Sequence, residues 1–557
     1  MKQIEYEWRF WALVVILILL ILGLIGRIIY LGIFEHDFLL GQSKLRSVRD
    51  VGTYVSRGII KDRHGTPLAI SVPAGSIWID PKLFRPEAKE LNLLSKFLEI
   101  DLKLIKSKWE KNIDREFVYL KRSVSMEIVK EIMSLGISGV FFEKGHKRHY
   151  PEGEAVAHVI GFTNIDDSGQ EGIELAYDHW LRGIPGKTRV LKDRLGNTVT
   201  TLAVLAEPQK GNDLLLSIDH RIQYLAYNEL KKAVLQRNAE SGSAIVLSVK
   251  TGEILAMVNV PSYDPSNRKG ISVSRMRNRA VTDLFEPGST IKAFSIANAL
   301  HSGKYKSTTV IDTNPGVFKV GGHVIYDNHH KNNGTLTVKE VLEKSSDIGT
   351  AKMTLSLPSN SLLNILKLVG FGKDTQSGFP GEASGFLPDR LEMRPFILAT
   401  LSFGYGISVT LLQLAQAYSI LAAGGIFRPV SFLKIDSPSG EVEVLPRQLC
   451  FEIINMLAAV VTRGTGSLAK IAGYKVAGKT GTSHIASPYG GYYSNRYFAS
   501  FVGFAPVFDP ELVVAVMVKD PKGAYFGSVV AAPIFANIMR GALRILGIKL
   551  DNIANRG

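Results

Sequence analysis

The first long apolar run is the most regular feature of the chain's hydrophobic pattern. It extends from Phe10 to Phe34 and carries a single charge, Arg27. A helix of about 20 apolar residues, rising roughly 1.5 Å per residue, spans the hydrocarbon core of a bilayer. We therefore predict a transmembrane anchor over residues 10–34, preceded by a short tail of residues 1–9. A cleaved signal peptide would place small residues after the run, whereas bulky residues follow Arg27.

After the anchor the pattern changes to short strand-like runs between turn signals. Residues 56–69, SRGIIKDRHGTPLA, predict a strand, a His-Gly turn and a second strand. We find no nucleophile, base and orienting group together in this part of the sequence. Near Gly211 the pattern switches to a strand followed by a long amphipathic helix. We therefore predict a non-catalytic, β-rich domain over residues 35–211 and a second domain over residues 212–557.

The second domain is predicted to combine an antiparallel sheet with helices. Residues 242–260, GSAIVLSVKTGEILAMVNV, predict a β-hairpin with a polar turn at residues 250–253. A helical middle is expected over residues 291–423, followed by three strand candidates and a closing helix over residues 529–547. Five strands with helices on both sides of them in the sequence indicate an α/β fold. In it, helices cover the two faces of one five-stranded antiparallel sheet.

Composition narrows the classes of partner. The 66 lysines and arginines against 51 aspartates and glutamates give a net charge of +15, which suits anionic membranes, polyanionic walls or nucleic acid. No RNP-like run and no zinc-finger spacing occurs, so we expect no nucleic-acid partner. The single cysteine, Cys450, excludes an internal disulfide. The histidines at positions 323, 329 and 330 lack a fixed helical spacing, so we expect neither a metal nor a cofactor.

Candidate chemistry begins with residues 473–483, GYKVAGKTGTS, which fit two signatures. The first eight residues match G-x-x-x-x-G-K-[ST], the phosphate-binding P-loop, and the last part contains K-T-G-T, a strand motif of active-serine enzymes that bind penicillin. A P-loop requires a helix that starts at the Lys-Thr pair. Here the residues after Thr480 are rich in glycine, serine and tyrosine. We therefore prefer the active-serine interpretation.

That interpretation requires a serine and a lysine three residues apart on one face of a helix. Ser-x-x-Lys occurs four times, at Ser266, Ser289, Ser431 and Ser467. Only Ser289 follows a Pro-Gly pair and precedes a good helix-forming segment. The third motif, Ser-Ser-Asp at residues 345–347, lies between Ser289 and the K-T-G-T segment. The order of the three motifs is more specific than any one of them.

With these motifs the chain resembles the class B penicillin-binding proteins, the monofunctional peptidoglycan transpeptidases, and most of all their division-specific, FtsI-type branch. The resemblance extends over nearly the whole chain. It is carried by the anchor, by the three motifs and by the segments RGIIKDRHGTPLA, DSGQEGIE, TGEILAMVNVPSYDP and FGYGISVTLLQLAQAYS. It implies the penicillin-binding transpeptidase fold for residues 212–557 and a non-catalytic pedestal domain for residues 35–211.

The resemblance also implies a role for each motif residue. Ser289 would attack the penultimate carbonyl of a D-Ala-D-Ala stem peptide, and Lys292, as a neutral amine, would take its proton. Ser345 would pass a proton to the leaving amine. Backbone amides of Ser289 and Thr482 would form the oxyanion hole. The K-T-G-T residues would hold the terminal carboxylate: Lys479, Thr480, Gly481 and Thr482.

One position departs from the family's pattern. The family's S-x-N motif ends in asparagine, which donates and accepts hydrogen bonds, whereas this chain has Asp347, which only accepts when it is ionised. The contact that asparagine makes to the substrate's amide carbonyl is therefore in question. Asp347 nevertheless remains a candidate substrate-binding residue.

The resemblance further implies partners and a location. The partners would be peptidoglycan stem peptides, β-lactams as covalent inhibitors, and a polytopic SEDS-type (FtsW-like) glycosyltransferase with other division proteins. The protein would be a single-pass protein of the inner (cytoplasmic) membrane, with its tail in the cytoplasm and its large domain on the periplasmic side. Septal crosslinking during cell division is the leading function. The alternatives are side-wall synthesis, a penicillin-acylated receptor and a catalytically idle division scaffold.

Overall fold

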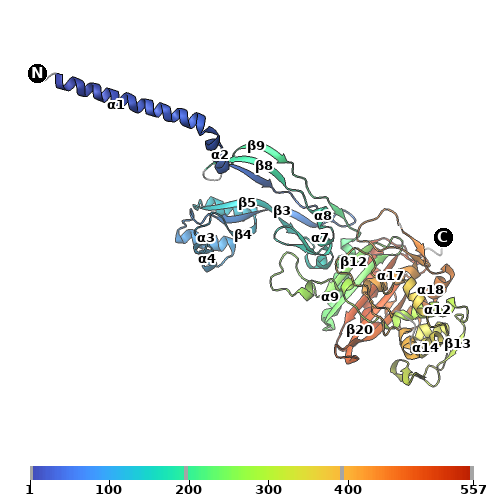
Figure 1. Cartoon of the computed structure of the whole chain (residues 1–557). Helices are drawn as coiled ribbons and strands as arrows, with labels where there is room; N and C mark the ends of the chain where they lie inside the picture. The colour runs from blue at the N-terminus through green and yellow to red at the C-terminus, as the bar shows by residue number, and fades with distance from the viewer. Residues whose placement is uncertain (1–3, 194–197, 389–393, 439, 552–557) are drawn as a thin grey trace.

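The computed structural model describes residues 4–193, 198–388, 394–438 and 440–551. Figure 1 shows a long N-terminal helix that points away from the rest of the chain, then a β-rich part, then a larger C-terminal part. The helix, α1 (Ile4–Ile29), continues through a π-helical turn (Tyr30–Phe34) into α2 (His36–Ser47). Of the predicted tail, residues 1–3 lie outside the described residues.

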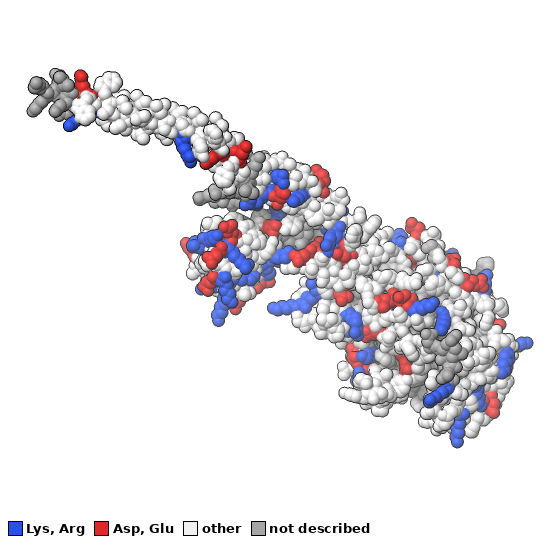
Figure 2. All heavy atoms as spheres, viewed as in Figure 1, with Lys and Arg blue, Asp and Glu red and all other residues white. Residues whose placement is uncertain are grey.

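The N-terminal helix has the properties of a membrane anchor. Within residues 7–34 the most apolar 18-residue window has a mean hydropathy of 3.0, and none of that window is buried inside the protein. In Figure 2 the visible surface of its central part is free of charged atoms. A second helix, α19 (Gly527–Ile545), is also long and apolar enough to cross a bilayer, but 56% of its apolar window is buried. Burial makes α19 a core helix and leaves α1 as the anchor.

The β-rich part contains two main sheets. One has the strand order β1-β8-β9 and the other the order β10-β2-β3-β4, with β5 also paired to β3. The strands are β1 (Val48–Thr53), β2 (Ile60–Lys61), β3 (Pro67–Ile79), β4 (Val118–Ser125), β5 (Val140–His149), β8 (Gly186–Lys192), β9 (Thr198–Ala206) and β10 (Leu214–Leu215). Three helices pack against β3 and β4 around a separate core: α3 (Ala88–Leu98), α4 (Leu102–Glu110) and α5 (Met126–Ser134). The predicted strand, turn and strand over residues 56–69 are confirmed as β2 and β3.

A buried ion-pair network holds the next segment of the chain in place. Arg57 and Arg148 both donate to the carboxylate of Glu174, over 2.6 and 2.7 Å, and all three side chains are at most 2% exposed. Glu174 lies in the first of two short helices, α7 (Gly172–Ala176) and α8 (Asp178–Leu181), which follow α6 (Ala157–Ile160), β6 (Phe162–Thr163) and β7 (Gly169–Glu171). Such networks are satisfied only when every partner is present, so they connect distant segments specifically.

The connection between the two large parts is not a free linker. After Gly211 the chain adds β10 in parallel to β2 before α9 (His220–Gln236) begins. Asp219 caps α9 by accepting a hydrogen bond from the backbone N–H of Arg221. The division at residues 211 and 212 therefore falls inside a segment that contacts both parts, and the two domains remain a prediction.

The C-terminal part is built on one antiparallel sheet with the strand order β12-β11-β21-β20-β19. The strands are β11 (Ser241–Ser248), β12 (Ile254–Val260), β19 (Ala477–Ala486), β20 (Tyr492–Ala505) and β21 (Leu512–Lys519). Helices α9 and α19 cover one face, and α17 (Leu411–Ala422) and α18 (Arg447–Thr462) cover the other. Along β21 the side chains alternate between the two cores, because successive residues of a strand point to opposite faces. The predicted sheet is confirmed.

The expected helical middle is only partly correct. It contains α12 (Lys292–His301), α13 (Val338–Lys344), α14 (Asp347–Leu355), α15 (Ser361–Leu368), α16 (Pro395–Leu401) and α17. Between α12 and α13, however, two small sheets form from β13 (Val310–Asp312) with β16 (Thr335–Thr337) and from β14 (Val317–Val320) with β15 (His323–Tyr326). Valine, threonine and aromatic residues with intervening glycines favour these short strands.

Candidate active site

Ser289 lies in a tight turn that leads directly into α12. The 3-10 turn spans Gly288–Ile291, and Lys292 is the first residue of the α-helix. Gly288 has φ +56°, and a Cβ there would lie 3.0 Å from the carbonyl oxygen of Thr482. Glycine is thus required both by the backbone conformation and by the close approach of β19. The Ser289 hydroxyl has no hydrogen-bond partner among the described residues, and Ser289 lines a cavity together with Ser345.

Ser345 lies at the junction of α13 and α14. It ends α13 in the left-handed conformation, with φ +59° and ψ +45°, and Ser346 then caps α14 by accepting from the N–H of Gly349. The carboxylate of Asp327 accepts the hydroxyl of Ser346 over 2.8 and 2.9 Å and the N–H of Ile348 over 3.0 Å. Asp327 therefore fixes the backbone that presents Ser345, although the sequence motifs did not single it out.

Two lysines meet at the Ser345 hydroxyl. Lys479 Nζ, from β19, lies 2.9 Å from Ser345 Oγ, and Lys292 Nζ, from α12, lies 3.2 Å from the same atom. Lys292 also donates to the carbonyl oxygen of Ser345 over 2.6 Å. Both lysine side chains are fully buried. Burial, together with the positive charge of Lys292, holds the pKa of Lys479 well below its usual value.

Asp347 forms a close ion pair with one of these lysines. Its Oδ1 lies 2.5 Å from Lys292 Nζ, and its side chain is 29% exposed while that of Lys292 is inaccessible. Burial raises the pKa of Asp347, and the charge of Lys292 acts against this effect. The carboxylate thus accepts from a lysine where the sequence predicted a substrate contact.

The remaining predicted residues lie on β19 beside the same cavity. Thr480 Oγ1 is 3.2 Å from Thr465 Oγ1, and Thr482 Oγ1 accepts the backbone N–H of Gly527 over 3.0 Å. A Cβ at Gly481 would lie 2.3 Å from Ser500 Oγ and 2.7 Å from the carbonyl oxygen of Pro287. Gly481 therefore allows the strand to approach the turn that carries Ser289. Since Lys479 lies inside a strand, the P-loop interpretation is wrong.

The cavity joins all three motifs. Its volume is about 310 Å³, and its lining includes Ser289, Ser345, Asp347, Thr480 and Thr482. The structure therefore brings all eight candidate residues to one place. The lining also includes residues that the motifs did not identify: Tyr326, His329, Tyr405, Thr465, His484, Tyr497, Tyr525 and Phe526. Two sequence features could have indicated such residues: the FGYG segment contains Tyr405, and the Gly-Thr-Gly turn contains Thr465.

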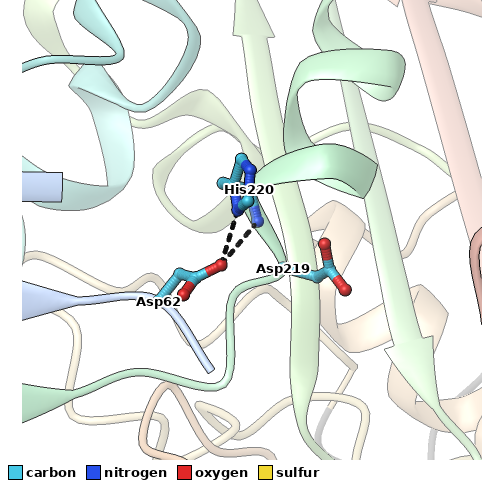
Figure 3. Close-up of side chains that lie close together, drawn as sticks. All are labelled: Asp62, Asp219 and His220. Atoms are coloured by element: carbon cyan, nitrogen blue, oxygen red, sulfur yellow. Dashed lines mark hydrogen bonds and ion pairs between the residues drawn. The ribbon is translucent and has the colours of Figure 1, made fainter. Parts of the chain in front are cut away.

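A separate cluster in Figure 3 could be mistaken for a metal centre. The ligand atoms of Asp62, Asp219 and His220 all lie within 4.8 Å of one another, the one such group found among the described residues. The carboxylates of both aspartates already have partners: His220 Nδ1 lies 2.7 Å from Asp62 Oδ2, and Arg221 lies 2.6 Å from Asp219 Oδ2. His64, in the turn before β3, also lies 3.1 Å from Asp219. The cluster is therefore a hydrogen-bonded junction between the β-rich part and α9.

Comparisons with known proteins identify the family of this chain. The family model "Penicillin binding protein transpeptidase domain" matches residues 242–540, and "Penicillin-binding Protein dimerisation domain" matches residues 53–216. A Pseudomonas aeruginosa protein named probable peptidoglycan D,D-transpeptidase PbpC is 42% identical over 99% of this chain and 98% of its own length. The Escherichia coli peptidoglycan D,D-transpeptidase FtsI is 40% identical over 98% and 93%.

A solved structure shows the same fold. The structure of penicillin-binding protein 3 from Mycobacterium tuberculosis, complexed with aztreonam, aligns with a TM-score of 0.71 and 26% identity. The alignment covers 90% of this chain and 98% of the other. Together with the two family matches and the two relatives, it shows that this chain belongs to the penicillin-binding protein transpeptidases, as a class B penicillin-binding protein of the FtsI type.

Proposed function

We propose that this chain crosslinks peptidoglycan during cell division by transferring an acyl group through Ser289. The observation that carries the proposal is the Ser345 hydroxyl between two buried lysines, in a cavity that Ser289 also lines. A serine needs a neighbouring base to become a nucleophile, and this arrangement supplies two amines and a hydroxyl that can pass protons between them.

The substrate would be held on β19. Lys479, Thr480 and Thr482 offer an ammonium and two hydroxyls to the terminal carboxylate of a D-Ala-D-Ala stem. The backbone N–H groups of Ser289 and Thr482 would donate to the developing oxyanion, a contact worth about 3 kcal/mol for each donor. Because β19 approaches the Ser289 turn closely at Gly288 and Gly481, Thr482 lies across a narrow space from the turn that carries Ser289.

The reaction would proceed in two transfers. Ser289 Oγ attacks the penultimate carbonyl while its proton moves to neutral Lys292. The bond to the terminal D-alanine then breaks, and Ser345 delivers a proton to the leaving amine. An amine of a second stem peptide attacks the resulting ester, and Ser289 regains its proton as the new amide forms. A β-lactam would acylate Ser289 in the same way as in the first transfer and would then remain attached to it.

The location and partners follow from the same proposal. The wall lies outside the cytoplasm, so residues 35–557 would face the periplasm and residues 1–9 the cytoplasm. Near the anchor, β9 exposes four apolar side chains that suit a membrane-embedded, SEDS-type (FtsW-like) partner: Val199, Leu202, Val204 and Leu205. The two-domain division, with a pedestal at residues 35–211 and a transpeptidase domain at residues 212–557, is part of this proposal.

Labelling with a fluorescent penicillin tests the nucleophile. We expect the full-length protein to be labelled, Ser289→Ala to lose the label, and Ser266→Ala, which changes another Ser-x-x-Lys serine, to keep it. Mass spectrometry should place the adduct on the peptide that contains Ser289. Label on a folded Ser289→Ala protein would contradict the assignment, and a folded but unlabelled wild-type protein would favour the idle scaffold.

Two further measurements separate the remaining alternatives. Crosslinked product from a defined stem peptide distinguishes a transpeptidase from a penicillin-acylated receptor. The shape of depleted cells distinguishes the two branches of wall synthesis: filaments indicate septal synthesis, whereas round cells indicate side-wall synthesis and would contradict the division role.

A further inference from the structure

The residue at position 347 presents a chemical conflict inside the candidate site. The related motif has asparagine at this position, whose amide can donate a hydrogen bond, and an ionised aspartate cannot. In addition, Asp347 Oδ1 lies 2.5 Å from Lys292 Nζ, and an ionised carboxylate at this distance attracts a positive charge on the amine. The proposed mechanism needs Lys292 without its proton, so the ionised carboxylate opposes the first step.

We propose that Asp347 is a positioning residue whose protonation switches the site from a resting to an acylating form. The inference rests on the proposed acyl transfer through Ser289. In the resting form the ionised carboxylate holds the positive charge on Lys292. In the acylating form the protonated carboxyl leaves Lys292 able to lose its proton and acquires an O–H donor in the place of the amide N–H of asparagine.

The groups around Asp347 define the charge balance of the site. Lys292 faces it from α12 and Lys479 from β19, while the charge of Asp327, in the loop after β15, raises the pKa of Asp347. Tyr405, from the loop after α16, also faces it and is neutral, since burial raises the pKa of its hydroxyl to about 12. The other titratable side chains that line the cavity are His329, Lys344, His484, Tyr326, Tyr497 and Tyr525.

One added proton on Asp347 is enough to allow a neutral Lys292. With Asp347 ionised, Lys292 charged and Lys479 neutral, the three groups sum to zero charge. Adding one proton to Asp347 leaves one positive charge for two amines, and no carboxylate then holds that charge on Lys292. Ser345 Oγ, 3.2 Å from Lys292 and 2.9 Å from Lys479, can accept from one amine and donate to the other. The charge can therefore move to Lys479 and leave Lys292 neutral.

The acylation step then balances without any additional reactant. The proton of Ser289 moves to Lys292 as Oγ bonds to the carbonyl carbon, and the charged Lys479 remains beside the substrate carboxylate. The raised pKa of Asp347 means that this form is populated closer to neutral pH than an ordinary carboxyl would allow. The acylation rate should consequently rise as pH falls toward the titration of Asp347.

The test is the pH dependence of acylation in the full-length protein. We would measure the second-order rate constant for labelling by a fluorescent penicillin from pH 4.5 to 8.5, for the wild type, Asp347→Asn and Asp509→Asn. Asp509 is a matched control because its carboxylate is 75% exposed and pairs with Lys250. Above the midpoint we expect the wild-type rate to fall by about tenfold for each pH unit. Asp509→Asn should follow the wild type.

The asparagine variant distinguishes the switch from a purely structural role. Asp347→Asn should lack the falling limb and label faster than the wild type at pH 8. A variant that is folded by circular dichroism but slower than the wild type at every pH would overturn the inference. Parallel profiles for the two proteins would do the same.

The pH profile of the wild-type protein tests the inference by itself, even when the Asp347→Asn variant does not fold. A rate that is constant or increases from pH 5 to pH 8 would overturn the inference. Loss of label in Ser289→Ala remains a separate result, so failure of the switch and failure of the proposed function are distinguishable.

Discussion

Carboxylates lie beside cations both in the candidate active site and at the junction before α9, yet their pKa values move in opposite directions. At the junction, burial would raise the pKa of Asp219, but hydrogen bonds from Arg221 and His64 lower it to about 2. In the cavity, burial raises the pKa of Asp347 although Lys292 is 2.5 Å away. Asp219 accepts several hydrogen bonds, each of which stabilises its charged form against the cost of desolvation, whereas Asp347 accepts from Lys292.

This difference separates a structural ion pair from the pair that we propose to be functional. A carboxylate with several donors stays ionised at every physiological pH and contributes to stability. A carboxylate with one donor, itself a buried lysine, is protonated more readily than an ordinary carboxyl. Substitutions should therefore affect stability at the junction and acylation at the cavity.

The largest expected effect is on activity, from Lys479→Ala. This change removes one of the two amines at Ser345 Oγ, so the acylation rate should fall by about 1000-fold or more. Labelling by a fluorescent penicillin measures the rate. Lys250→Ala, in the other Lys-Thr-Gly sequence, is the control, because Lys250 pairs with Asp509 and Glu511 at the surface. Equal acylation rates in the two variants would contradict a functional role for Lys479 in the candidate active site.

Asp219→Ala should have the next largest effect, on the stability of the protein. The change removes the cap of α9 and leaves Arg221 and His64 without their shared carboxylate, so the free energy of unfolding should fall by about 3 kcal/mol. Urea denaturation followed by circular dichroism measures it. The folded protein should still be labelled at the wild-type rate. A loss of labelling without a loss of stability would place this junction in the catalytic machinery instead.

The pH dependence of stability should also distinguish the carboxylate at the junction from the one in the candidate active site. Because the pKa of Asp219 is lowered from 3.8 to about 2, its contribution is complete above about pH 4 and is lost as pH falls through pH 2. The loss should amount to about 2 kcal/mol. It is measured as the difference in unfolding free energy between the wild type and Asp219→Asn, which should shrink across this range. A constant difference would show that the charge of Asp219 is irrelevant.

The smallest effect is expected from Gly288→Ala. Its φ of +56° is unfavourable for alanine, and the new Cβ would lie 3.0 Å from the carbonyl oxygen of Thr482. The strain of about 1 kcal/mol should move the Ser289 turn away from β19 and lower the acylation rate by several-fold. Gly303→Ala is the control, because its φ is +70° but no atom lies within 4 Å of its Cβ. A similar effect of both variants would mean that backbone strain alone is responsible.

The sequence predicted features that depend on local order more successfully than those that depend on long-range contacts. The anchor, the hairpin of β11 and β12, and β19 to β21 follow from hydrophobic periodicity and turn residues. The candidate site follows from the order of three motifs, and its residues meet in one cavity. The small sheets of β13 to β16 were missed because three- and four-residue strands carry almost no periodic signal.

The ion pair of Asp347 and Lys292 could not be predicted for a different reason. The two residues are far apart in the sequence, and their motifs imply separate roles: proton transfer for Lys292 and substrate binding for Asp347. Asp327 was missed similarly, since its effect on Ser346 acts across a turn that has no motif. The roles of all eight site residues remain predictions until variants are measured.

The position of the β-rich part has a mechanical consequence. In Figure 1 it lies between α1 and the C-terminal part that contains the cavity, and α1 continues into it without a long flexible tether. With α1 inserted in a bilayer, this body acts as a spacer that sets the height at which the cavity opens above the lipid surface. If the cavity faces the wall, as we propose, the working range of the enzyme is a shell of defined depth, and strands of wall outside that shell are beyond its reach.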